Sequence, residues 1–162
     1  MKLSTPKYII SACLAGINCT YKGSNKLHPA INKLYKKGLA IAVCPEVMGG
    51  LNTPRENSEI TGGDGYRVIQ GRCKVISSSG KDLTEKYIYG SLSILDLVNR
   101  FGIKKAILKS KSPACGFGLI YDGTFKNNIK PGSGVLAALL YKKGLKIFTE
   151  KTAGQLLKIY KT

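Results

Sequence analysis

The chain has 162 residues, of which 26 are Lys or Arg and 9 are Asp or Glu, so its formal net charge is +17. Hydrophobic residues make up 43% of the sequence. A chain of this length and composition buries about two thirds of its unfolded surface in a core, which excludes an intrinsically disordered protein. We therefore expect a single domain that covers residues 1–162.

The sequence also argues against a membrane protein. No apolar run approaches the ~20 residues that a membrane-spanning helix needs, and the longest extends only from Val135 to Leu140. The N-terminus lacks the hydrophobic stretch of a signal peptide. We predict a cytoplasmic protein without membrane contact, whose five cysteines act as thiols, metal ligands or catalytic groups because the cytoplasm keeps them reduced.

Positive charge is concentrated toward both ends of the chain. The net charge is +7 over residues 1–45, −1 over residues 46–96 and +11 over residues 97–162. An excess of this kind attracts polyanions, so we expect a phosphate-bearing partner such as a nucleic acid. The alternative is that the lysines only keep the protein soluble, and the scattered Tyr and Phe residues, which form no stacking motif for single strands, do not decide between the two.

Short apolar strands alternate with helical patterns along the chain. In chain order we predict a strand at 8–11, a helix at 28–37, a strand at 39–43, a hairpin of 66–70 with 73–77, a helix from Asp82 or Thr84 to about Arg100, a strand at 105–109, a helix at 134–143, a strand at 145–148 and a short C-terminal helix.

This alternation predicts the fold class. Strands joined through helices make right-handed crossovers, which give a mainly parallel sheet covered on both faces. We therefore predict an α/β fold, a Rossmann-like three-layer sandwich with a small β-hairpin. In such sheets ligands bind beyond the carboxyl ends of the strands.

Three cysteines occupy such positions. Cys13 follows the first strand, Cys44 follows the second, and Cys115 lies in the loop after the third, so we expect their thiols to meet at one edge. Three thiolates suit a soft metal, and because a cubane iron-sulfur cluster usually takes four ligands, three would leave one iron open as a Lewis acid. The alternative is that they are buried structural cysteines. We expect a structural or incidental role for Cys19 and Cys73, and of the two Cys19 is the better candidate for an exception.

Zinc is the nearest alternative metal, since a zinc ion also accepts three protein ligands and an open water. The single histidine, His28, opens the predicted helix beside Pro29. At that position we expect a surface or capping role for the imidazole in place of metal ligation.

Three longer motifs resemble a known family. They are Ser-Ala-Cys-Leu-Ala-Gly at 11–16, Cys-Pro-Glu-Val-Met-Gly-Gly-Leu-Asn-Thr-Pro-Arg at 44–55, and Leu-Lys-Ser-Lys-Ser-Pro-Ala-Cys-Gly at 108–116. Together they resemble the DUF523 family, which includes thiouracil desulfidases and short members linked to sulfur removal from 4-thiouridine in tRNA. The resemblance implies a 4Fe-4S cluster held by three cysteines, which on this chain are Cys13, Cys44 and Cys115.

The hypothesis is an iron-sulfur-dependent desulfidase that hydrolyses the C=S bond of a thiolated pyrimidine without a redox change. The open iron would bind the thiocarbonyl sulfur while water adds to the carbon. Glu46, two residues after Cys44 and the first acid in the chain, is the candidate base that takes a proton from this water.

Other polar residues near the cysteines are candidates for substrate contacts. Ser110 and Ser112 precede Cys115 and are expected to hold the pyrimidine edge or the developing anion, with a turn-forming role as the alternative. Lys109 would add positive charge. Arg55 would bind a phosphate or carboxylate, or else form an ion pair with a nearby acid, Glu56 or Glu59.

Two other functions stay open. One is a sulfurtransferase with a persulfide on Cys115 or Cys44, since a low-pKa thiolate is a competent nucleophile. The other is an RNA-binding module with a structural or redox-sensing cluster. A free base carries no phosphate and would gain little binding energy from the basic segments. We therefore expect the substrate to be a thiolated tRNA or nucleotide in preference to free thiouracil. We also expect the enzyme to be a monomer.

Overall fold

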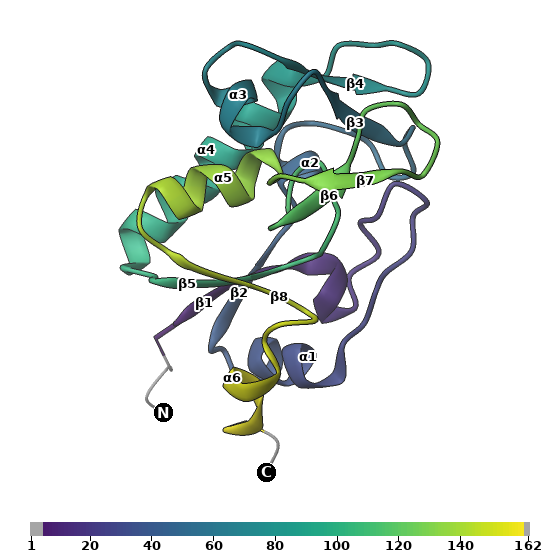
Figure 1. The fold of residues 1–162 in the computed structure, drawn as a ribbon. Helices are drawn as coiled ribbons and strands as arrows, with labels where there is room; N and C mark the ends of the chain where they lie inside the picture. Colours follow the sequence, from purple (N-terminus) through teal and green to yellow (C-terminus); the bar gives the residue numbers. More distant parts are fainter. Residues whose placement is uncertain (1–4, 161–162) are drawn as a thin grey trace.

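The computed structural model of the protein describes residues 5–160 and places a four-stranded parallel sheet at its centre (Figure 1). The strands lie in the order β2-β1-β5-β8. Their bounds are Tyr8–Ser11 for β1, Ala40–Val43 for β2, Lys105–Leu108 for β5 and Lys146–Thr149 for β8. The predicted α/β class is confirmed. Residues 1–4, part of the segment from which we expected no signal peptide, lie outside the described range.

Helices cover both faces of this sheet, so the predicted three layers are present (Figure 1). Successive residues of a strand point to opposite faces: Ile9 packs into one core and Ile10 into the other. The core that contains Ile10 is covered by α1 (Pro29–Lys36) and α6 (Gly154–Lys158). The core that contains Ile9 is covered by α4 (Thr84–Phe101) and α5 (Val135–Lys142). No helix within residues 5–160 has the length and hydropathy to span a membrane.

The predicted hairpin of 66–70 with 73–77 is wrong in its first strand. Residues Gly65–Ile69 form the helix α3, because the Asp64 side chain accepts hydrogen bonds from the backbone amides that begin it. The strand β4 (Lys74–Ser77) pairs antiparallel with β3 (Ser58–Thr61), which lies before α3. A second antiparallel pair, β6 (Leu119–Tyr121) with β7 (Ile129–Pro131), forms between the predicted strand at 105–109 and the predicted helix at 134–143, where no regular element was expected.

The order of the parallel strands determines where a ligand can bind. The chain runs from β1 to β2 through α1 on one face, and it reaches β5, on the other side of β1, through α4 on the opposite face. The connection that leaves β5 contains α5, which lies on the same face as α4. The connections that leave β1 and β5 therefore diverge, and a crevice opens at the carboxyl ends of these strands. Cys13 lies in the 3-10 helix η1 (Ala12–Ala15) that follows β1 directly.

The short helix α2 (Pro45–Met48), which follows β2, packs tightly on α4. A Cβ atom at Gly90 of α4 would lie only 1.9 Å from the carbonyl oxygen of Pro45, and one at Gly49 would lie 2.1 Å from the carbonyl oxygen of Lys86. Glycine at these positions thus lets the two backbones touch, which fixes the residues of α2 relative to the sheet.

We expect Gly90→Ala to lower the free energy of unfolding by about 1–3 kcal/mol, because the added methyl group forces α2 away from α4. Chemical denaturation of the metal-free protein under reducing conditions measures this change. Gly154→Ala is the matched control, since its Cβ would meet no atom within 4 Å and should leave the stability unchanged or slightly higher. Equal stability of the two variants would show that the close packing is unimportant.

Candidate functional site

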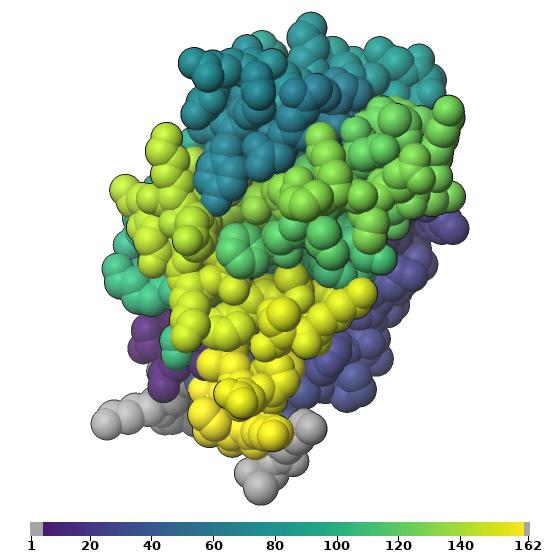
Figure 2. Space-filling model, viewed as in Figure 1, coloured from purple at the N-terminus to yellow at the C-terminus, as the bar shows by residue number. Residues whose placement is uncertain are grey.

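A cavity of about 420 Å³ opens at the carboxyl ends of β1, β2 and β5. Its wall includes residues from η1, the loop after η1, the start of α2, β3, the loop after β5 and the β6–β7 ribbon. In Figure 2 the green surface of that ribbon lies directly above the yellow segment that follows β8, which contributes Lys151 to the wall. Segments far apart in the sequence thus surround one space at the predicted sheet edge.

The three cysteines singled out in the sequence all line this cavity. Cys13 lies in η1, Cys44 is the residue before α2, and Cys115 follows β5. Cys13 and Cys115 are buried and Cys44 is partly buried. The structure also places a fourth thiol, that of Cys19, on the same wall, where the sequence had indicated a structural residue.

The arrangement differs from a site for one metal ion. Within residues 5–160, no three His, Cys, Asp or Glu side chains are grouped so that they could hold a single ion. His28 is not among the lining residues, and this disfavours the zinc alternative. A cubane cluster makes a different demand, because each of its cysteines binds a different iron atom and the thiols stand around a larger body. Three thiols on the wall of one cavity fit that demand.

The protein environment raises the pKa of the thiols of Cys19, Cys44 and Cys115 and so favours their protonated forms. A hydrogen bond with Cys19, followed in importance by burial, raises the pKa of Cys44, and burial raises the pKa of Cys115. A hydrogen bond with Cys13 is the main cause that raises the pKa of Cys19 to about 11. A metal centre would have to displace protons to bind, whereas a thiol that acts as a free nucleophile needs a lowered pKa.

Glu46 lies at the start of α2, and its carboxylate lines the cavity. Its Oε1 atom accepts a hydrogen bond of 2.6 Å from the Tyr87 hydroxyl, and its Oε2 atom lies 3.1 Å from a guanidinium nitrogen of Arg55. Tyr87 also contacts the hydroxyl of Ser58. Burial and the negative charge of Glu46 raise the pKa of Tyr87 well above its ordinary value, so this phenol stays protonated and keeps donating to Glu46.

Arg55 is 7% exposed and spans two parts of the wall. One of its terminal nitrogens donates to the Cys19 carbonyl at 2.8 Å, and its Nε donates to Glu46 at 3.3 Å. The expected ion pair with Glu56 or Glu59 is wrong: the partner is Glu46. Of the two expected acids, Glu56 lies 3.6 Å from Lys81 and Glu59 accepts backbone amides. Arg55 thus ties the loop of Cys19 to the carboxylate.

We expect Arg55→Ala to lower the free energy of unfolding by about 1–3 kcal/mol, because it leaves the partly buried Glu46 carboxylate without its cation. The control is Arg100→Ala, whose ion pair with Asp96 is exposed on α4 and should contribute about 0.5 kcal/mol or less. Chemical denaturation of both metal-free variants measures the difference. Similar small losses for the two would contradict this view of the ion pair.

Lys109 and Ser110 are held by an acid that the sequence analysis had not singled out, Glu150. The Lys109 ammonium lies 3.0 Å from Glu150, and the Ser110 hydroxyl and amide donate to the same carboxylate at 2.6 and 2.8 Å. Burial alone would raise the pKa of Glu150, but these hydrogen bonds lower it. The charge of Lys109 is therefore already partnered, although both Lys109 and Ser110 line the cavity.

Ser112 shapes the loop that carries Cys115. Its hydroxyl accepts hydrogen bonds of 3.1 Å from the backbone amides of Ala114 and Cys115. The turn-forming alternative for Ser112 is thus realised, while the residue also lines the cavity. Between the two serines, Lys111 adopts a φ of 65°, a conformation that is uncommon for a residue with a side chain, and it also lines the cavity.

Several residues of the wall were missed by the sequence analysis. Cys19, Glu59 and Tyr121 line the cavity, and Tyr87 and Glu150 hold residues that do. Glu59 is buried, and one of its oxygens accepts the amides of Gly123 and Phe125. Only for Cys19 did the sequence contain a signal, since it follows Cys13 by six residues in a polar loop.

The chain is similar to known proteins over nearly its whole length. The model of the 2-thiouracil desulfurase family matches residues 8–152. The Bacillus subtilis (strain 168) protein YbbK is 42% identical over 149 residues, which are 92% of this chain and 99% of YbbK. The solved structure of the 4Fe-4S-dependent thiouracil desulfidase TudS is similar with a TM-score of 0.83 and 36% identity, over 95% of this chain and 97% of that one. This chain belongs to the 2-thiouracil desulfurase family.

Proposed function

We propose that the protein is a 4Fe-4S-dependent desulfidase that removes sulfur from a thiolated pyrimidine by hydrolysis. The observation that carries this proposal is the convergence of Cys13, Cys44 and Cys115 on one cavity, with the carboxylate of Glu46 on the same wall. The similarity to TudS over nearly the whole chain supports it. In the net reaction, the oxygen of a water molecule takes the place of the sulfur, so that C=S becomes C=O and hydrogen sulfide leaves. No oxidant or reductant is needed.

Cys13, Cys44 and Cys115 are the proposed ligands. When bound, a cluster with three protein ligands supplies an open iron that acts as a Lewis acid toward a thiocarbonyl sulfur. The ligands come from three separate connections of the sheet, and Ser112 fixes the loop of the third through two backbone amides. The protein thus holds the ligand positions through its backbone.

Glu46 is the proposed general base. Its carboxylate is oriented from two sides, by the Tyr87 hydroxyl and by the Arg55 guanidinium. A base oriented in this way takes a proton from a water molecule that attacks the pyrimidine carbon. Since Arg55 is fully engaged with Glu46, the Cys19 carbonyl and its own loop, we propose that it acts on the substrate through Glu46.

The serines and Lys109 are proposed to shape the opposite part of the wall. Glu150 orients Ser110 and neutralises Lys109, so we propose that Lys109 supports the Ser110 hydroxyl at the pyrimidine edge. We propose that Ser112 contributes to substrate binding by holding the loop around Cys115 in shape. Because the Ser110 hydroxyl donates to Glu150, it offers the substrate an acceptor, whereas the Ser112 hydroxyl accepts two amides and keeps its proton to donate to charge that develops during the reaction.

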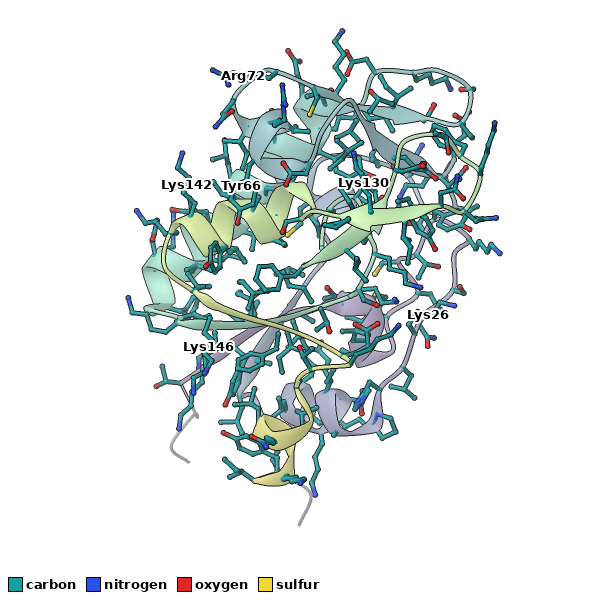
Figure 3. The ribbon with its side chains drawn as sticks, in the orientation of Figure 1. Lys26, Tyr66, Arg72, Lys130, Lys142 and Lys146 are labelled. Carbon is teal, nitrogen blue, oxygen red and sulfur yellow. The ribbon has the colours of Figure 1, made fainter. Side chains whose placement is uncertain are left out.

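A phosphate-bearing substrate is the finer part of the proposal. Lys22, Lys26, Lys111 and Lys151 line the cavity, and none of them has a carboxylate partner among residues 5–160. Figure 3 labels Lys26 together with further basic side chains at other places on the molecule, Arg72, Lys130, Lys142 and Lys146. Such a surface favours a thiolated nucleotide or tRNA over a free base.

Anaerobic reconstitution with iron and sulfide tests the proposal. We expect broad visible absorbance, equal amounts of iron and acid-labile sulfide, and sulfide release from 4-thiouridine-containing tRNA, 4-thiouridine monophosphate and 4-thiouracil. The phosphate-bearing substrates should have the higher kcat/KM, and this preference should decrease as the salt concentration rises. A protein that binds no cluster, or a loaded protein that releases no sulfide from any of the three, would contradict the proposed function.

The two alternatives give different results in the same experiment. A sulfurtransferase would carry a persulfide on Cys44 or Cys115, which mass spectrometry detects, but the raised pKa values of both thiols disfavour it. An RNA-binding module would show salt-dependent binding of thiolated tRNA without sulfide release.

A further inference from the structure

A fourth cysteine, Cys19, belongs to the wall of the proposed cluster site. It lines the same cavity as Cys13, Cys44 and Cys115, and it is only 7% exposed. The remaining cysteine, Cys73, does not line the cavity, and its thiol donates to the backbone carbonyl of Asp64. The position of Cys19 at the proposed cluster site therefore calls for a functional explanation, whereas that of Cys73 does not.

The contacts of Cys19 single out two of the proposed ligands. A hydrogen bond with Cys13 is the main cause that raises the pKa of its thiol, and one with Cys44 opposes that shift. In addition, the thiol of Cys44 lies 3.8 Å from the carbonyl oxygen of Cys19, to which it donates. Cys19 thus lies beside Cys44 on the wall of the same cavity as Cys13 and Cys115.

The backbone holds Cys19 in this place. Its amide donates to the carbonyl of Ile17 at 2.9 Å, and its carbonyl accepts from Arg55 at 2.8 Å. The same loop returns to η1 through the amide of Lys26, which donates to the carbonyl of Cys13 at 2.9 Å. Because these bonds involve the backbone, they remain when the side chain of Cys19 is replaced.

The chemistry of a loaded site assigns Cys19 a role different from that of its neighbours. A cysteine that binds iron gives up its proton, whereas a cysteine that is not a ligand keeps its S–H group and can donate it. Ligands of a cubane cluster bind different irons and stand apart around it. A thiol that lies beside a ligand position without occupying one therefore has the position of a hydrogen-bond donor to a ligand sulfur, and not that of a separate fourth ligand.

We propose that Cys19 is a positioning residue that donates an S–H hydrogen bond to the sulfur of Cys13 or Cys44 when these residues hold the cluster. This inference rests on the proposed function, because it requires a cluster in the cavity. Hydrogen bonds to the ligand sulfurs stabilise the more negative, reduced cluster and so raise its reduction potential. Loss of the donor should lower the potential while all three ligands stay in place.

Three variants test this proposal on the full chain after anaerobic reconstitution: Cys19→Ala, Cys19→Ser and, as the matched control, Cys73→Ala. The measurements are iron and sulfide content, electron paramagnetic resonance and the reduction potential by spectroelectrochemistry. We expect Cys19→Ala to keep the iron content of the wild type but to show a lower potential. Cys19→Ser, which retains a donor, should recover part of the shift, and Cys73→Ala should match the wild type.

Two outcomes would overturn the inference alone. An unchanged potential in Cys19→Ala would show that no hydrogen bond from Cys19 reaches the cluster. A loss of one iron in that variant, with the resonance of a three-iron cluster, would show that Cys19 is a ligand. Failure of the proposed function is distinguishable from both, because it is seen in the wild-type protein, which would then bind no cluster.

Discussion

Replacing Cys115 with alanine should give a folded protein that binds no intact cluster and releases no sulfide from thiolated substrates. Two remaining ligands are too few to hold a cubane cluster beside an open iron. The loop should keep its shape without the thiol, because the Ser112 hydroxyl binds backbone amides and the carbonyls of Pro113 and Ala114 accept the amides of Val135 and Leu136 at 2.9 Å.

The measurements are iron and acid-labile sulfide content, visible absorbance and sulfide release, with circular dichroism as the check on folding. Cys13→Ala and Cys44→Ala should behave like Cys115→Ala, since each removes one of the three proposed ligands. Cys73→Ala should retain the cluster and the activity, because Cys73 lies outside the cavity. Normal turnover by a metal-free Cys44→Ala protein would refute the proposed site.

The second large effect is expected for Glu46→Gln, which should retain the cluster and lose about 10²–10⁴-fold in kcat, the usual contribution of a general base. Glutamine preserves the size of the side chain but accepts no proton from water. KM should change little, because the proposed role of Glu46 concerns the attacking water and not the binding of the pyrimidine.

Two further variants keep this prediction specific. Glu85→Gln, at the exposed start of α4, is the matched control and should be fully active. Tyr87→Phe removes the 2.6 Å hydrogen bond to Glu46 but leaves the carboxylate and Arg55, so its loss of kcat should be smaller than that of Glu46→Gln. A fully active Glu46→Gln protein would remove Glu46 from the role of base, and loss of its cluster would assign Glu46 to cluster binding.

The agreement between sequence and structure is best where a local pattern decides the conformation. The apolar run at 105–108 became a central parallel strand, and the helix expected from Asp82 or Thr84 to Arg100 is observed as Thr84–Phe101. The hairpin failed for a local reason as well: the Asp64 cap and the burial of Val68 favour a helix at 65–69 over the strand that its β-branched residues indicated.

In the candidate site, too, some features could be predicted from the sequence and others could not. Cys13, Cys44 and Cys115 were accessible to sequence reasoning because each follows a strand of a parallel sheet, and parallel strands present their carboxyl ends at one edge. The partners of the polar residues were not. Glu46 pairs with Arg55 and Tyr87, and Ser110 with Glu150, across separations of 9 to 41 residues along the chain.

By itself, the sequence determined the α/β class and the meeting of Cys13, Cys44 and Cys115 at one cavity, since both depend on periodicity and on which residues follow each strand. The tertiary structure alone decided that Cys19 joins the cavity, that Arg55 binds Glu46, and that Glu150 neutralises Lys109. The physical reason is that an ion pair or a thiol contact depends on where distant loops meet, and packing such as that of Gly90 against Pro45 sets those positions.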